Sequence, residues 1–356
     1  MDSKLMKKIK IGYRPLSATL TAAGDRRRLL FWAKNRGHEI VFDLDQRVDV
    51  IVASENSDFQ SPYFTQKGVP VVFDLVDAYL SPLNPWDDFA RGLAKKLSGQ
   101  ITGSVKPFSE HVKNFCGTST AVICSSPEQE AVIKPHNPNI HIILDSHDEI
   151  PLLDPRLTKR NSQKELNVLW EGQPATIRGV KQISSILFLL SKENDLHFDF
   201  VTDEKYFQFL GKYLKMNTLQ LMKKDLEPII DRIGITPWTP DNLVASAKKS
   251  LISMIPIDLT IPMQKLKPEN RLLIMWRLGL PCLTSPSPAY IRVAGQAGVK
   301  AICNDPKMWL ENFGNLLSDP EFAREEVLRG QNYLHEHHNR EALLKKWDRV
   351  IESAIG

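Results

Sequence analysis

The chain has 356 residues, of which 42% are hydrophobic and 25% are charged. This composition is typical of a folded globular protein, and the length predicts two domains rather than one. A formal net charge of +4 favours an anionic small ligand or an acidic membrane surface and falls far short of a nucleic-acid binder's charge excess. We therefore expect no nucleic-acid partner.

Short apolar segments alternate with amphipathic ones along the first half of the chain. Apolar runs of strand length occur at 7–12, 39–43, 48–53, 70–74, 121–124 and 140–144. Helical patterns lie between them, at 26–35, 86–96, 110–115 and 127–133. This alternation predicts a parallel sheet that is covered by helices on both faces.

A polar segment with two prolines, residues 150–166, interrupts this pattern and is predicted to link two domains. The alternation then resumes, with strands predicted at 167–170, 197–201, 251–255, 281–284 and 300–303, and helices at 179–191, 225–232, 241–246 and 271–278. Two long polar helices are predicted at the end, at 306–317 and 321–355, with a break near His338. The predicted fold class is therefore α/β, with two doubly wound halves.

No apolar run approaches the ~20 residues that a membrane-spanning helix requires, and the basic, strand-like start lacks the apolar core of a signal peptide. The four cysteines, Cys116, Cys124, Cys282 and Cys303, form no C-x-x-C pair, which predicts buried free thiols in a reducing compartment. We expect a cytoplasmic protein, with peripheral contact to the inner face of the membrane as an open alternative.

The most informative stretch is Lys265–Tyr290, in which a basic loop opens a predicted helix. Lys265, Lys267 and Arg271 carry positive charges at the start of that helix, and Asn270 adds an amide side chain. Backbone N–H groups at a helix start are partly positive as well. Together these groups predict a site for a phosphate or diphosphate.

A second candidate element follows the strand at 168–170. Gly172 comes just after that strand, and Gln173 and Arg178 lie between it and the helix that begins at Gly179. These elements, in this order, resemble the retaining GT-B glycosyltransferases of the family 4, or group 1, type. In that family a Gly, an Arg and then a Lys-Gly pair follow the strand, and the basic pair holds the donor diphosphate.

In this chain Gln173 stands where the family has Arg, and Arg178 stands where it has Lys. Arg binds two phosphate oxygens at once, so the second replacement keeps the chemistry. The resemblance implies a set of donor-binding residues: Gly172, Gln173, Arg178, Lys265, Lys267, Asn270 and Arg271.

The turn after the predicted helix adds to the resemblance. The family has two Glu eight positions apart, followed by an Ala-x-Gly-x-Pro-Val turn, and here the turn is Gly279-Leu280-Pro281. The paired Glu positions fall near Leu266 and Ile274, and a Lys-Pro-x-Asn-Arg loop stands in their place. The chain thus resembles a divergent branch.

The resemblance implies two Rossmann-like domains facing each other across a cleft. Their limits are 1–155 for the acceptor side and 156–330 for the nucleotide-sugar side, with a C-terminal helix, 331–356, returning to the first domain. The implied enzyme is a hexosyl- or glycosyltransferase of polysaccharide biosynthesis. It would move a sugar from a nucleoside-diphosphate donor to a hydroxyl of a polysaccharide, lipid-linked or small-molecule glycan, with retention and without metal or cofactor.

Such a transfer develops negative charge on the leaving diphosphate, and fixed cations and amides stabilise it. Arg178 and Lys267 are the candidates for this role. On the acceptor side, Asp77 follows a predicted strand and is expected to orient the acceptor hydroxyl or take its proton. Gly24 and Asp25, in the loop after the first strand, are predicted to line the acceptor site.

Other motifs have simpler interpretations. Asp43-Leu44-Asp45 imitates a metal-binding Asp-x-Asp but ends a strand, which favours a turn. His335 and His338 have helical spacing for zinc without a third ligand, which favours a solvated helix end. The run Arg26–Arg28 suits anionic lipid, but its apolar neighbours favour the first helix of the sheet. No G-x-G-x-x-G fingerprint occurs, which argues against a dehydrogenase.

Two functional alternatives stay open. The missing pair of Glu favours a non-catalytic two-domain binder. A GT-B epimerase, which changes the sugar of the donor itself, shares the expected fold.

Overall fold

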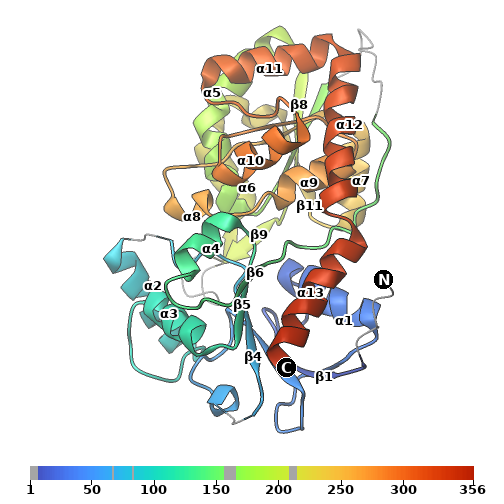
Figure 1. The fold of residues 1–356 in the computed structure, drawn as a ribbon. Coiled ribbons are helices and arrows are strands. Elements are labelled where there is room, and N and C mark those ends of the chain that lie inside the picture. The colour runs from blue at the N-terminus through green and yellow to red at the C-terminus, as the bar shows by residue number, and fades with distance from the viewer. Residues whose placement is uncertain (1–6, 66–67, 82–83, 156–165, 208–214) are drawn as a thin grey trace. The chain divides into compact units, whose positions relative to one another are not determined.

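A computed structural model describes residues 7–65, 68–81, 84–155, 166–207 and 215–356 (Figure 1). The chain divides into two compact units: the first comprises Met1–His147, Leu266–Pro268 and Asn339–Gly356, and the second comprises Asp148–Lys265 and Glu269–His338. The boundaries after His147 and His338 each lie eight residues from the predicted limits at 155 and 330. The assignment of Leu266–Pro268 to the first unit was not anticipated.

The first unit is built on a six-stranded parallel sheet. Its strands are β1 (Lys10–Arg14), β2 (Glu39–Val41), β3 (Val50–Ser54), β4 (Val71–Asp74), β5 (Ala121–Cys124) and β6 (Ile140–Ile142). Their order is β2-β1-β3-β4-β5-β6, and every pair is parallel. The apolar runs predict six strands in this half, and all six are confirmed. Three of them, β3, β4 and β5, are buried along their whole length.

Helices cover both faces of this sheet. They are α1 (Leu30–Arg36), α2 (Pro85–Leu97), α3 (Phe108–Thr118), α4 (Pro127–Ile133) and α13 (Arg340–Ile355). On one face α1 and α13 pack together, with the rings of Trp32 and Trp347 stacked 5.9 Å apart. Trp32 also donates a hydrogen bond to Asp348. The predicted return of the C-terminal helix to the first unit is confirmed.

The second unit holds a five-stranded parallel sheet. Its strands are β7 (Leu166–Glu171), β8 (Leu196–Thr202), β11 (Ile233–Pro237), β12 (Ser250–Ile255) and β13 (Cys282–Thr284), in the order β11-β8-β7-β12-β13. A separate antiparallel pair is formed by β9 (Lys205–Phe207) and β10 (Lys215–Asn217). The predicted strand at 300–303 was wrong, because only Ile302 forms a bridge, to Thr284.

The helices of this unit are α5 (Ile177–Glu193), α6 (Thr218–Asp225), α7 (Pro240–Lys249), α8 (Pro262–Lys265), α9 (Asn270–Arg277), α10 (Pro288–Ala297), α11 (Pro306–Ser318) and α12 (Pro320–His337). The break near His338 is confirmed, and a 3-10 helix (Glu227–Arg232) replaces most of the predicted helix at 225–232. Sequence analysis missed the strands β9, β10 and β11 and the helices α6, α8 and α10. The capping signals of α10 were present: Ser287 accepts the amide of Tyr290, and Pro288 is the first helical residue.

All four cysteines are buried and unpaired with one another, as predicted. Burial raises the pKa of each thiol to about 12, so none is a reactive thiolate at neutral pH. Within the described ranges, no helix is both long and apolar enough to cross a bilayer.

Candidate functional site

The strand order of each sheet reverses once along the chain, between β1 and β3 in the first unit and between β7 and β12 in the second. In open α/β sheets, ligands bind beyond the carboxyl ends of the strands at such points. The candidate residues of the sequence lie in loops that follow β1, β4, β7 and β12. The topology therefore gives each unit one edge at which a ligand is expected.

In the second unit, glycines allow a tight connection from β7 to α5. A Cβ atom at Gly172 would lie 2.7 Å from the hydroxyl oxygen of Thr176, and one at Gly179 would lie 2.2 Å from the carbonyl oxygen of Pro256. At Gly179 the neighbouring atoms are backbone, so only glycine permits the approach without a shift of the backbone, whereas at Gly172 the neighbouring side chains would have to move. The 17-residue helix α5 thus follows the strand after a short connection that contains the 3-10 turn Pro174–Thr176.

The start of α5 is open. Thr176, at the N-cap, makes no side-chain hydrogen bond to the helix amides. Gln173 and Arg178 are exposed, and within the described part of the chain no hydrogen bond or ion pair holds the guanidinium of Arg178. A short 3-10 turn, Pro174–Thr176, leads into the helix, and Ile177 and Gly179 are buried beside the exposed Arg178. The guanidinium of Arg178 therefore offers a full positive charge next to a helix start, an arrangement that suits an anion.

Near this strand end, Oε2 of Glu171 and Nε of Arg271 are buried without a hydrogen bond but form an ion pair with each other, and three further buried polar atoms have no hydrogen-bond partner among the described residues. They are Nε1 of Trp170 in β7, Oγ1 of Thr202 at the end of β8 and Oδ1 of Asn270 at the start of α9. A buried polar group of this kind is uncommon and costs about 1–3 kcal/mol of stability. A polar ligand at the strand ends would supply the missing partners.

Glu171 organises the same strand end. Trp238 donates its indole N–H to one carboxylate oxygen at 3.0 Å, and Nε of Arg271 lies 3.4 Å from the other. Arg271 also donates to the carbonyl oxygen of Glu171, and its guanidinium lies over the ring of Trp170. Arg271, predicted to bind the donor, is therefore engaged by Glu171 in this structure.

The remaining predicted donor residues of this unit lie on either side of the loop that opens α9. Lys265 ends α8, is exposed, and makes no hydrogen bond or ion pair with a described residue. Asn270 is the first residue of α9. Between them Glu269 is buried, with its carboxylate 3.3 Å from Arg292.

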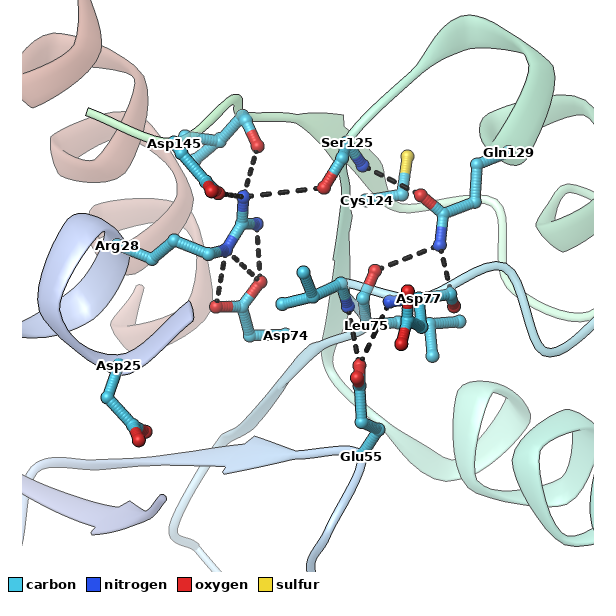
Figure 2. Close-up of polar contacts among 12 residues, drawn as sticks. Asp25, Arg28, Glu55, Asp74, Leu75, Asp77, Cys124, Ser125, Gln129 and Asp145 are labelled. Atoms are coloured by element: carbon cyan, nitrogen blue, oxygen red, sulfur yellow. Dashed lines mark hydrogen bonds and ion pairs between the residues drawn. The ribbon is translucent and has the colours of Figure 1, made fainter. Parts of the chain in front are cut away.

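In the first unit, the loop after β4 is clamped by two side chains that approach it from opposite sides (Figure 2). One carboxylate oxygen of Glu55 accepts the amides of Val76 at 2.7 Å and Asp77 at 3.1 Å. The side-chain amide of Gln129 donates to the carbonyl oxygens of Leu75 and Asp77, each at 3.0 Å. The backbone that carries Asp77 is therefore held on both its donor and acceptor sides.

The structure brings two of the predicted catalytic residues together. Nζ of Lys267 lies 3.3 Å from Oδ1 of Asp77, and both side chains are partly exposed. The hydroxyl of Ser126 donates to the carbonyl oxygen of Leu266 at 2.7 Å, which holds the segment next to Lys267. Asp77 and Lys267 thus share one solvent-accessible site.

Glu55 is a buried carboxyl group beside this site. Its burial, together with the negative charges of Asp77 and Asp74, raises its pKa to about 8. A group with this pKa is mostly protonated at neutral pH. Glu55 therefore clamps the Asp77 loop largely without adding a second full negative charge to it.

A buried ion-pair network lies behind the loop. The fully buried guanidinium of Arg28 contacts Asp74 at 2.5 Å and Asp145 at 3.3 Å, and it donates to the carbonyl oxygen of Ile143 and to Ser125. These partners lie at the ends of β4, β5 and β6, so one arginine ties three strands together (Figure 2).

The run Arg26–Arg28 begins in a π-helical turn (Asp25–Leu29) that leads into α1. Arg27 and Arg28 are buried. The run therefore belongs to the first helical segment of the sheet, and it does not form the cationic lipid surface that the alternative interpretation required.

Asp25 is fully buried. Its carboxylate accepts hydrogen bonds from the hydroxyl of Tyr13, the amide of Leu16, and both the amide and hydroxyl of Ser17. Gly24 is buried next to it, with Leu16 where a Cβ atom would be. Gly24 and Asp25 were predicted to line the acceptor site, but both are buried. They stabilise the loop after β1, and the carboxylate of Asp25 is not exposed to solvent.

No protein-family model and no curated protein matches this sequence. Solved structures match the described fold. HepE from Anabaena, in complex with UDP and glucose, has a TM-score of 0.63 at 11% identity over 97% of this chain and 100% of its own. A glycosyltransferase from Rickettsia africae has a TM-score of 0.61 at 11% identity, over 98% and 99%. The chain has the GT-B fold.

TarM, from S. aureus, is a further GT-B match, with a TM-score of 0.57 and 11% identity. The match covers 85% of this chain but 54% of TarM, so this chain corresponds to about half of that longer protein. At such identities the comparison establishes the fold, and the roles of individual residues rest on the geometry described above.

Sequence reasoning missed several residues that this GT-B chain places at its strand ends: Glu55, Arg28, Gln129, Glu171 and Trp238. Glu55 follows the apolar strand β3 directly and Glu171 is the last residue of β7, a signal that could have found them. Arg28 and Gln129 lie inside helices, and Trp238 follows the missed strand β11, so the sequence pattern alone did not distinguish them.

Proposed function

We propose that this protein is a glycosyltransferase that moves a sugar from a nucleoside-diphosphate donor to a hydroxyl acceptor. The observation that carries the proposal is the set of buried polar atoms without partners beside the exposed Arg178 at the start of α5. A nucleotide offers both hydrogen-bonding groups and an anionic diphosphate for this site. The GT-B fold, and HepE with bound UDP and glucose, support the same ligand class.

Each part of the proposed donor site has a physical role. The amides of the first turn of α5 and the guanidinium of Arg178 stabilise the charge that develops on the leaving diphosphate. Trp170, Thr202 and Asn270 hydrogen-bond the nucleoside. Glu171 keeps Arg271 in place beside them.

On the first unit, Asp77 orients the acceptor hydroxyl or takes its proton. The clamp of Glu55 and Gln129 fixes the backbone of that loop, since small misplacements of a reacting group reduce rates strongly. Lys267 is the neighbouring cation. The proposal includes retention of configuration and no requirement for metal, and analysis of the product anomer by NMR tests the first of these.

The first experiment is a thermal-stability titration with UDP, GDP, ADP and TDP in the presence of EDTA. A ligand that binds only the folded protein raises its melting temperature. A rise with one nucleotide supports a metal-independent donor site and identifies the base. The absence of any rise at millimolar nucleotide would contradict the proposal.

Product analysis then separates the enzyme from its alternatives. A transferase releases nucleoside diphosphate in proportion to added acceptor. A binder leaves the nucleotide sugar intact, and an epimerase changes its sugar without any acceptor. Either of these results with the matching nucleotide sugar would replace the proposed function.

A further inference from the structure

Helix α2 turns two cations toward the body of the first unit. The guanidinium of Arg91 lies over the ring of Tyr79, 5.3 Å from its centroid. Nζ of Lys95 lies 5.1 Å from the centroid of the Phe108 ring. The rings of Tyr79 and Phe108 meet edge to face with their centroids 5.0 Å apart. Arg91 and Lys95, four positions apart on one face of the helix, therefore lie around the same pair of aromatic rings.

Neither cation forms an ion pair with a carboxylate of a described residue. Among these residues Arg91 has no hydrogen-bond acceptor, and its Nη1 atom is buried. Nζ of Lys95 donates to the side-chain oxygen of Asn56 at 3.2 Å. Burial lowers the pKa of Lys95 because it disfavours the charged form of the amine. Positive charge that is buried without an anion is costly, and a bound anion would offset the cost.

The acidic groups of this region do not neutralise the two cations. Glu55 is mostly protonated at neutral pH, since its pKa is raised to about 8. Asp77 is paired with Lys267 at 3.3 Å. In the first turn of α2, the carboxylate of Asp88 accepts hydrogen bonds from the start of α3, and Asp87 is exposed. Within the described ranges, neither of these two acids forms an ion pair with a cation of α2.

Two buried hydroxyls lie on the chain segments next to the cations. Ser57 is 4% exposed and Ser81 is 3% exposed, and the hydroxyl of each lacks a hydrogen-bond partner among the described residues. Ser57 directly follows Asn56, the residue that Lys95 contacts. Ser81 closes the turn that contains Tyr79. Buried hydroxyls without a partner are uncommon and lower stability, so these two are available to a polar ligand.

The groups gathered here are hydrogen-bond donors that suit an anion. A carboxylate or a phosphate only accepts hydrogen bonds, and guanidinium, ammonium and hydroxyl groups all donate them. The cluster also lies beside the loop that carries Asp77, because Lys95 is close enough for the charges of Glu55 and Asp77 to act on it. An anion held by α2 would therefore belong to a molecule that reaches Asp77.

We propose that the acceptor of this protein carries an anionic group, a carboxylate or a phosphate, which Arg91 and Lys95 bind. The hydroxyls of Ser57 and Ser81 are further donors to that group. This inference rests on the proposed function, because it specifies the acceptor on which Asp77 acts. A neutral acceptor leaves both cations without an anion, so the site discriminates in favour of acidic acceptors.

Melting curves at constant ionic strength test the proposal with three probes: methyl glucuronide for the carboxylate, glucose 6-phosphate for the phosphate, and methyl glucoside as the neutral sugar. An anionic probe at millimolar concentration should raise the melting temperature of the wild type more than the neutral sugar does. Its affinity should fall at least about tenfold in Arg91→Gln, because a charged hydrogen bond is lost. Lys95→Gln, the second variant, should show a loss of the same sign.

The matched control is Arg47→Gln, which removes an exposed guanidinium from the same unit and should bind the anionic probe like the wild type. Arg178→Ala separates this site from the donor site, and it should keep the probe affinity of the wild type. Binding that is lost in Arg178→Ala and kept in Arg91→Gln would assign the anion to the donor site and overturn the proposal.

Titration of the same variants with the nucleoside diphosphate that the wild type binds separates this inference from the proposed function. Arg91→Gln should bind the nucleotide like the wild type, since Arg91 is not among the proposed donor residues. Equal stabilisation of the wild type by charged and neutral probes would overturn the anionic acceptor. So would equal anion affinity in Arg91→Gln and the wild type. Neither result would affect the nucleotide binding on which the proposed function depends.

Discussion

The two sheets differ in how the buried polar groups at their strand ends are paired. In the first unit the buried guanidinium of Arg28 is paired with Asp74, and the buried atoms that lack a partner among the described residues include the hydroxyls of Ser57 and Ser81, further along the loops after β3 and β4. In the second unit Trp170, Thr202 and Asn270 each keep a buried polar atom without a partner among the described residues. A paired buried group rigidifies its surroundings, whereas an unpaired one lowers stability until a ligand pairs it.

This difference indicates that the two units have different roles. The first unit uses its buried network to hold the backbone around Asp77 in one position. The second leaves hydrogen-bonding capacity open at the corresponding edge of its sheet. Substitutions in the two regions should therefore have opposite signatures, with lost stability in the first and lost ligand affinity in the second.

The largest expected effect is on the stability of the first unit. Arg28→Met leaves the buried carboxylates of Asp74 and Asp145 without their cation, so we expect the free energy of unfolding to fall by about 3–5 kcal/mol. Urea denaturation followed by circular dichroism measures the loss. Arg26→Met, which removes an exposed hydrogen bond to the carbonyl oxygen of Thr21, is the control and should cost less than about 1 kcal/mol. Equal losses of stability in Arg28→Met and Arg26→Met would contradict the structural role of the buried ion pairs.

A second effect concerns the pH dependence that Glu55 confers. Its pKa in the folded protein is raised by burial to about 8 from the ordinary value of 4.5, so the folded state binds more protons than the unfolded state between these values. Stability contributed by this group is therefore present below about pH 4.5 and is lost as pH rises to about 8.

Glu55→Gln removes this titration and keeps an oxygen that can accept the loop amides. From pH 5 to pH 8.5 the wild type should lose stability relative to this variant by on the order of 3 kcal/mol, measured by urea denaturation at each pH. Glu110→Gln, at an exposed position, is the control. Parallel curves for the wild type and Glu55→Gln would show that the carboxyl does not titrate in this range.

In the second unit the largest expected effect is on nucleotide affinity. Arg178→Ala removes a charged donor, and charged hydrogen bonds contribute about 1.5–3 kcal/mol, so the dissociation constant for the preferred nucleoside diphosphate should rise roughly tenfold to a hundredfold. Calorimetric titration measures it. Lys181→Ala, one turn further along α5 and paired with Asp225, should change affinity by less than about twofold. Unchanged affinity in a folded Arg178→Ala protein would refute the assignment.

The smallest expected effect is that of Thr202→Val, which should not lower stability as Arg28→Met does. Thr202→Val replaces a buried hydroxyl that has no partner with a methyl group, so the ligand-free protein should keep its stability or gain up to about 1 kcal/mol, while nucleotide affinity falls. Thr236→Val is the matched control, because its hydroxyl donates to Asp199 at 2.9 Å and its loss should destabilise. A loss of stability in Thr202→Val would show that the hydroxyl has a partner within the folded protein.

Much of the architecture could be predicted from local sequence. Strands such as β3 and β5 are continuous apolar runs, and buried parallel strands require them. The elements that were missed depended on weaker signals: β11 contains a glycine and ends at a proline, and α10 begins with a capping serine in a stretch that resembled a loop.

The sequence by itself determined the two α/β halves, the break at His338, the tight turn at Gly172 and the positive charge at the start of α5. These features depend on residues close together in the chain, where apolar spacing, capping and glycine act directly. Only the tertiary structure decided that Arg28 pairs with Asp74, 46 positions away, that Glu55 and Gln129 clamp the Asp77 loop, and that two cations of α2 face inward. Such contacts depend on how strands and helices pack, because their partners are distant in sequence and the same residue types occur elsewhere on exposed surfaces.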